Sequence, residues 1–166
     1  MLVIMTAFSG CSTYQFGSRS LFRDNIRTVY VPIIRNDTFR HDLGVRLTEA
    51  VIRTIEMRTP YKATGDPNAD STLTVRFNSE AKRVLTENRT DDPRALDVLV
   101  TAQAVWIDRF GNPLMQNQLT VEGNIATDFL QSERMVPEAG QSVEVALQAA
   151  IEDLAERIVS QMENRW

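Results

Sequence analysis

The sequence predicts an α+β fold: a mixed sheet of four or five strands with two α-helices packed on one face. A buried-strand run at 26–34, an amphipathic segment at 42–57 and an alternating run at 71–77 form a strand–helix–strand unit with parallel strands. A long alternating run then predicts antiparallel strands, and a second amphipathic segment ends the chain. The 166 residues, 43% of them hydrophobic, suit one domain with a substantial core.

The first half begins with a near-continuous apolar run. Residues 26–34 are rich in β-branched and aromatic side chains, so we expect a strand buried on both faces. Asn36-Asp37 should end it in a turn. The helix that follows, with Asp42 as its N-cap, ends at Thr59-Pro60, because proline disfavours helical geometry in the preceding residue. Its apolar stripe consists of Leu43, Leu47, Ala50, Val51 and Ile55.

The same helix carries Val45 and Ile52 roughly opposite its main stripe. This second apolar line indicates either contact with the neighbouring helix or a surface for a partner protein. Residues 61–64 can form a short edge strand, and residues 71–77 form the second strand of the unit.

The strongest strand of the second half is Ala95 to Ile107. One face of it carries Leu96, Val98, Val100, Ala102, Ala104 and Trp106. Residues 82–87 form a weaker segment before it. Residues 108–112 predict a hairpin loop in which Gly111 adopts positive φ. We expect Leu114 to Ile125 to be the return strand of this hairpin.

Ser142 is the expected N-cap of the last helix, with Glu144 in its first turn. The apolar stripe of this helix contains Val143, Leu147, Ala150, Ile151, Leu154, Ile158 and Met162. The stripe needs a sheet face to cover, so both helices should lie side by side on the same face.

Residues 1–10 have the composition of a lipoprotein signal peptide remnant, apolar and then small, directly before Cys11. We therefore predict lipidation at Cys11, a lipidated tether over residues 11–25, and a single domain over residues 26–166. The alternative is an N-terminal apolar strand with a buried cysteine.

The composition argues against several classes of function. A net charge of −4 argues against bulk nucleic-acid binding. The single Cys cannot form an internal disulfide, and the single His argues against most His-built metal sites. His41-Asp42 has no recognisable nucleophile partner. Asp91-Asp92 and the pair Asp66 and Asp70 lack the ligand density of a calcium loop. We expect no metal, no cofactor and no enzymatic activity.

Several short motifs together carry a family resemblance. They are the Cys11 motif with Tyr14, the run at 26–33, residues 36–39, 47–50, 58–62 and 69–73. In this order they resemble the lipopolysaccharide-assembly lipoproteins of the LptE type, especially those of planctomycete-like bacteria. The similarity covers Cys11 to about Asp108. It implies two helices on a mixed sheet in a domain that plugs an outer-membrane β-barrel translocon (LptD type) and assists delivery of lipopolysaccharide.

A lipid anchor at the periplasmic face of the outer membrane fits this resemblance, since Ser12 resembles an outer-membrane address. The alternative function is an envelope lipoprotein that activates a cell-wall synthase or serves another periplasmic complex.

Basic residues gather around the second and third strands. Arg suits phosphate because its planar guanidinium can donate hydrogen bonds to two phosphate oxygens at once. We expect Arg83 and Arg89 to bind lipopolysaccharide phosphates; the alternative is ordinary strand and turn charge. The full set is Arg76, Lys82, Arg83, Arg89 and Arg94.

Overall fold

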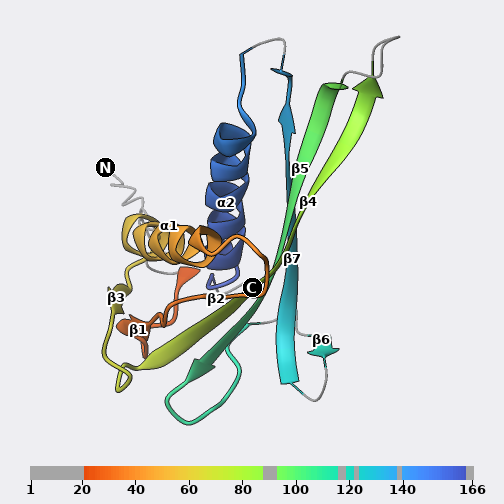
Figure 1. Ribbon diagram of the computed structural model, residues 1–166. Coiled ribbons are helices and arrows are strands. Elements are labelled where there is room, and N and C mark those ends of the chain that lie inside the picture. The colour runs from red at the N-terminus through yellow and green to blue at the C-terminus, as the bar shows by residue number, and fades with distance from the viewer. Residues whose placement is uncertain (1–20, 88–92, 116–118, 122–123, 138–139, 164–166) are drawn as a thin grey trace, which may run out of the picture.

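The computed structural model describes residues 21–87, 93–115, 119–121, 124–137 and 140–163. It confirms the predicted α+β class, with a mixed sheet and two helices on one face (Figure 1). The elements are β1 (Thr28–Tyr30), β2 (Arg35–Asn36), α1 (Asp42–Arg58), β3 (Lys62–Thr64), β4 (Ser71–Glu87), β5 (Pro93–Asp108), β6 (Leu119–Val121), β7 (Asn124–Met135) and α2 (Val143–Ser160).

The sheet has a parallel part and an antiparallel part. Its order is β3-β1-β4-β5-β7-β6, and β2 pairs separately with β4. β1 is parallel to both β3 and β4, whereas β4–β5, β5–β7 and β6–β7 are antiparallel. The sheet has more strands than the four or five expected. Three of the described strands, β2, β3 and β6, contain only two or three residues each, and strands this short leave little periodic pattern in a sequence.

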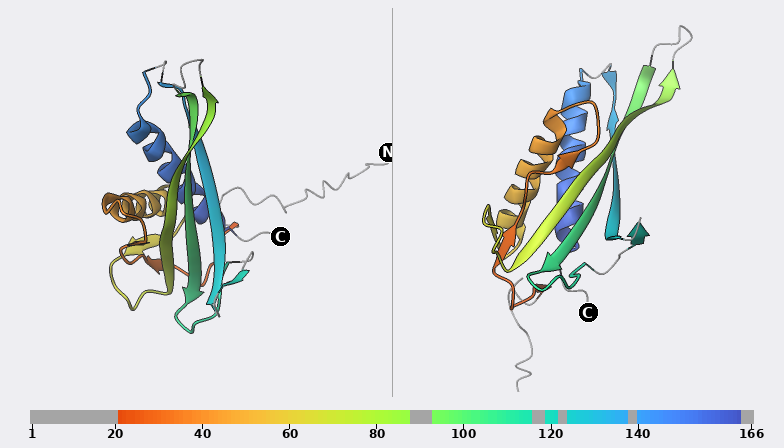
Figure 2. Two further views of the ribbon diagram at one scale, coloured as in Figure 1. Left: turned by 45° about the vertical axis from the view of Figure 1, so that its right-hand side comes forward. Right: turned by 60° about the horizontal axis from the view of Figure 1, so that its bottom comes forward.

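The two helices lie side by side on one face of the sheet, as two views agree (Figure 2). Their first turns lie close together: the Arg46 guanidinium donates to Oε1 of Gln148, with Nη2 at 2.7 Å. Near the other end of α1, Arg58 pairs with Glu156 of α2 at 2.5 Å. The predicted stripes of both helices are buried against the sheet, and the Ser142 side chain caps α2 by accepting from Val145 N. The arrangement predicted for the two helices is therefore confirmed.

α1 sits directly on the loop that precedes β2. A Cβ at Gly44 would lie 2.6 Å from the carbonyl oxygen of Ile34. One turn later, buried Thr48 Oγ1 accepts from Ile34 N at 3.0 Å and donates to Gly44 O. The helix backbone approaches this loop so closely that only glycine fits at position 44.

Asp70 joins the two parts of the sheet. Its Oδ2 accepts from the backbone nitrogens of Arg27 and Thr28 at 3.0 and 3.1 Å, and Oδ1 pairs with the Arg109 guanidinium beyond β5. These hydrogen bonds, with the one from Arg27 N as the largest cause, lower the pKa of Asp70. In the next layer inward, buried Trp106 Nε1 donates to Ser71 Oγ at 3.0 Å.

The structure corrects the predicted first strand. β1 has only three residues, and Ile33 is 79% exposed, so the run at 26–34 is not a strand buried on both faces. The chain leaves the sheet after β1 and returns at β2, where Asn36 Oδ1 accepts from Thr38 N at 2.9 Å. The N-cap of α1 is His41 rather than Asp42, and Asp42 instead pairs with Arg46.

The predicted return strand was wrong. The turn at 108–112 forms, with Gly111 at φ 84°, and the pairing continues through the bridge between Ile107 and Pro113 and the hydrogen bond from Leu114 N to Trp106 O, without a strand at 113–115. β7 is the strand that pairs along β5, from Ala104↔Thr127 to Leu96↔Met135. Its inward positions are partly polar, and Gln131 for example bonds Asp153 of α2, so the apolar alternation that marks β5 is missing.

The other predictions for individual elements have mixed outcomes. The weaker segment 82–87 is the continuation of β4, and the short edge strand at 61–64 is β3. Of the second apolar line on α1, Ile52 packs against the core, whereas Val45 is 52% exposed. The signal remnant, Cys11 and most of the tether lie outside the described residues.

Gly44→Ala should destabilise the fold by about 1–3 kcal/mol, because the new methyl group overlaps the Ile34 carbonyl. Urea unfolding followed by circular dichroism measures the change. Gly65→Ala is the matched control, since a Cβ there meets nothing within 4 Å. Equal stability of the two variants would contradict the close approach.

Asp70→Asn should lower the free energy of unfolding at pH 7 by roughly 1–3 kcal/mol, because the amide accepts fewer of these hydrogen bonds. The folded pKa of Asp70 is lowered, so its contribution is present above the ordinary value of 3.8 and is lost as the pH falls through the folded pKa. The wild type should therefore lose its advantage over the variant below about pH 4. Unfolding curves at a series of pH values test this, with the same change at exposed Asp24 as control.

Candidate functional site: the projecting hairpin and the open sheet face

The β4–β5 hairpin is the most extended feature of the molecule. Its strands contain 17 and 16 residues and pair from Ser71↔Asp108 to Glu87↔Pro93. The distal part runs past the ends of both helices (Figures 1 and 2). At about 3.3 Å per residue, β4 alone spans about 50 Å.

A β-bulge at Asn78 sets which side chains of β4 face the helices. Phe77 pairs with Ala102 and Ser79 with Thr101, so Asn78 is an extra residue on β4. Before the bulge the odd-numbered side chains, such as buried Val75 and Phe77, face the helices. After it the even-numbered ones do, because Glu80 and Lys82 pair with buried Val100 and Val98.

The face turned away from the helices is called here the open face, because no described element packs on it (Figure 2). On its distal half, Arg83, Asp97 and Arg134 form one cross-strand row through paired positions of β4, β5 and β7. Arg134 Nε lies 3.4 Å from Asp97 Oδ1. The row holds two cations and one anion, so it carries a net positive charge. Leu99 lies in the next row on this face and Leu130, 55% exposed, in the row after that, so both add apolar surface to the open face.

Nearer the middle of β4, the open face carries a separate ion cluster. Asp37 accepts from Arg76 and also pairs with Arg35, whose Nε lies 3.2 Å from Oδ1. The hydrogen bond from Arg76 is the largest cause of the lowered pKa of Asp37. The positive charge of Arg76 and the hydrogen bond from Arg35 lower this pKa further. The Arg76 guanidinium is therefore paired with Asp37 within the protein. It lies seven residues along β4 from Arg83 and does not belong to the distal row.

On the helix side, Arg40 is the centre of a charge network. Its guanidinium lies 2.9 Å from Glu144 of α2 and 3.7 Å from Glu80 of β4. The hydrogen bond from Arg40 is the largest cause of the lowered pKa of Glu144. The network ties the base of the distal hairpin to the first turn of α2, so the hairpin direction is fixed relative to the helices.

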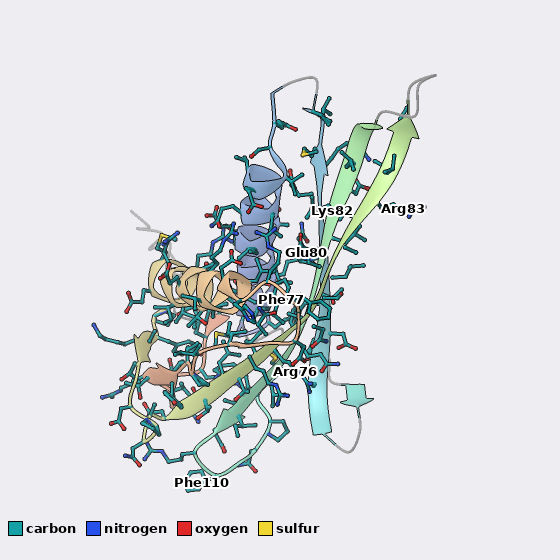
Figure 3. The ribbon with its side chains drawn as sticks, viewed as in Figure 1. Arg76, Phe77, Glu80, Lys82, Arg83 and Phe110 are labelled. Atoms are coloured by element: carbon teal, nitrogen blue, oxygen red, sulfur yellow. The ribbon has the colours of Figure 1, made fainter. Side chains whose placement is uncertain are left out.

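The structure separates the basic residues that the sequence grouped together. Lys82 and Arg83 are neighbours on distal β4 (Figure 3), but consecutive strand residues face opposite sides, so only Arg83 is on the open face. Arg89 lies outside the described residues, and the side chain of Arg94 is likewise not described. Sequence analysis missed Arg134, because the strand that carries it was not predicted.

The described part of the chain shows no candidate metal centre. It contains no cluster of three or more His, Cys, Asp or Glu side chains that could hold a metal, and no buried side-chain N or O atom there lacks a hydrogen bond. No helix among those residues is long and apolar enough to cross a membrane.

Comparison with known proteins decides the family. A model for the family described as LptE, lipopolysaccharide-assembly, matches residues 26–166. The chain belongs to the LptE family. The match includes α2 and so extends well past Asp108, where the resemblance seen in the sequence ends. No curated protein matches the chain.

Solved structures with this fold share little sequence with the family member described here. A PelC dodecamer from Paraburkholderia phytofirmans has a TM-score of 0.56 at 13% identity, covering 86% of this chain and 92% of that one. CT253 from Chlamydia trachomatis gives 0.55 at 9% identity, covering 81% and 94%. Lipoprotein B from Nitrosomonas europaea gives 0.52 at 12% identity, covering 82% and 81%. At these identities the likeness shows a common fold.

Proposed function

We propose that this protein is a non-enzymatic lipoprotein of the lipopolysaccharide-assembly machinery, anchored through Cys11 at the periplasmic face of the outer membrane. The family match over residues 26–166 is the observation that carries the proposal. The apolar-then-small residues before Cys11 support the anchor. The resemblance to planctomycete-like members stays a prediction about the host.

We further propose that the domain plugs and assists an outer-membrane β-barrel of the LptD type. The lumen of such a barrel is polar, and a plug needs outward surfaces that tolerate a polar wall. The open face supports this role because polar and charged side chains, such as Thr101, Gln103 and Asp128, alternate with the buried positions of its strands. The β4–β5 hairpin, about 50 Å long in total, extends the domain along one axis, with its distal part beyond the helices.

Lipopolysaccharide phosphates are the proposed ligand of the distal open face. Arg83 is exposed and lies in register with Asp97, which pairs with Arg134. An approaching phosphate can bind the Arg83 guanidinium and compete with the Asp97 carboxylate for that of Arg134. Arg89 keeps its proposed role as a further contact.

A second candidate function is service in a different envelope complex, including activation of a cell-wall synthase. The likeness to PelC favours keeping it, because the same fold there occurs in a dodecamer. Affinity purification from detergent-solubilised outer membrane separates the two: a large β-barrel should co-purify under the first proposal, and a peptidoglycan synthase or other complex under the second.

Cys11→Ser should release the protein from the membrane fraction, because the thioether-linked lipid supplies the buried methylenes that hold it. Fractionation of cells followed by immunoblotting measures the loss, which should exceed tenfold. Ser12→Ala, at the neighbouring position, is the control for expression and processing. Membrane retention of an unacylated Cys11→Ser protein would contradict the anchor.

Arg83→Glu should weaken binding of purified lipopolysaccharide by about 5- to 50-fold, because it replaces a charge-assisted contact with repulsion. Lys82→Glu makes the same change one residue away on the opposite face of β4 and should have less than a twofold effect. Fluorescence titration with labelled lipopolysaccharide compares the variants. Equal effects would show that overall charge, rather than the open face, determines binding.

A further inference from the structure

We propose that the turn carrying Phe110 is a membrane-contact point, which places the Phe110 ring in the lipid interface of the leaflet that holds the anchor. The inference rests on the proposed lipidation of Cys11 and extends it to the orientation of the whole domain. Phe110 is 82% exposed and lies at the end of the molecule opposite the hairpin tip (Figure 3).

The turn is rigid, so the exposure of the ring is a fixed feature. Asp108 Oδ1 accepts from the backbone nitrogens of Phe110 and Asn112, each at 2.8 Å, and Gly111 adopts φ 84°. Arg109 is bound to Asp70 through both its backbone nitrogen and its guanidinium. The fold thus holds a large apolar side chain outward at the apex of an ordered turn, where it contributes little to the core.

This turn lies at the end of the domain where the N-terminal segment enters. Asp70, which holds Arg109, also accepts from the backbone of Arg27. The start of the described chain is fixed nearby, because Arg23 Nη2 donates to Leu114 O at 3.3 Å. Phe22 and Trp106 both contact the Tyr61 ring there, with ring centroids 5.6 and 5.8 Å away.

The length of the tether keeps this end of the domain near the leaflet that holds the anchor. Leu21 follows Cys11 by ten positions, so a fully extended tether reaches about 35 Å. The hairpin tip lies about 50 Å along β4 from the Asp70 end. A tether of this length brings the Phe110 turn, at the end of the domain where the chain enters, within reach of the leaflet that holds the lipid.

The occupant that fits this surface is the interfacial region of a lipid leaflet. An aromatic ring on a membrane-binding surface gains free energy by entering the boundary between headgroups and acyl chains. A single ring binds weakly, but the anchor keeps it at high effective concentration beside the membrane. The contact orients the domain so that the hairpin points away from the leaflet.

The test uses full-length, lipidated protein reconstituted into phosphatidylcholine–phosphatidylglycerol vesicles. Cys11 is the only cysteine of the chain and is acylated in this protein, so Phe110→Cys supplies a single thiol for a nitrobenzoxadiazole label. Phe39→Cys is the matched control: Phe39 is also fully exposed, in a loop whose Asp37 nitrogen bonds Phe77 O. That point lies six residues, or about 20 Å, along β4 from Ser71.

Nitroxide lipids should quench the label at position 110 at least twice as strongly as the label at position 39. Quenching at position 110 that is equal to or below that at position 39, in protein whose Cys11 acylation is verified by mass spectrometry, overturns the membrane contact and leaves the proposed anchor standing. An unmodified Cys11 in the mass spectrum overturns the anchor and the contact together.

Discussion

The carboxylate of Asp70 is the constraint on which the rest of the architecture depends. It lies between the parallel part of the sheet, through Arg27 and Thr28, and the antiparallel part, through Arg109. A strand of three residues such as β1 makes few backbone hydrogen bonds to its neighbours, too few to define its register by themselves. The hydrogen bonds from the backbone of Arg27 and Thr28 to Asp70 add to them at the start of β1. Buried Trp106, whose ring nitrogen reaches Ser71 beside Asp70, continues the junction into the core.

From that junction the molecule acquires two unlike ends. One end contains the entry of the chain, an aromatic cluster and the Phe110 turn. At the other, the hairpin leaves the helices, and Arg40 ties its base to α2. The two ends therefore differ in shape and in chemistry: an aromatic cluster lies at one, and the β4–β5 hairpin extends beyond the helices at the other.

The sequence predicted those elements whose side chains meet a uniform apolar surface. α1, α2 and β5 show regular spacing because all their inward residues contact the same core, and Ser142 caps α2 through a local interaction. β7 escaped prediction because its inward Gln131 is satisfied by Asp153 and Arg157, contacts that depend on tertiary structure. The Arg83–Asp97–Arg134 row could not be predicted for the same reason: it requires the correct strand neighbours, and only Arg83 was identified.

The bulge at Asn78 has a consequence for how such proteins can diverge. Side chains alternate with a period of two, so removing one residue there would rotate everything distal to it onto the reverse side. Lys82 and Arg83 would exchange sides in one step, without any substitution of a charged residue. Insertions and deletions of single residues at this position are therefore a simple evolutionary route for moving the hairpin's chemistry from one surface to the other while the core stays intact.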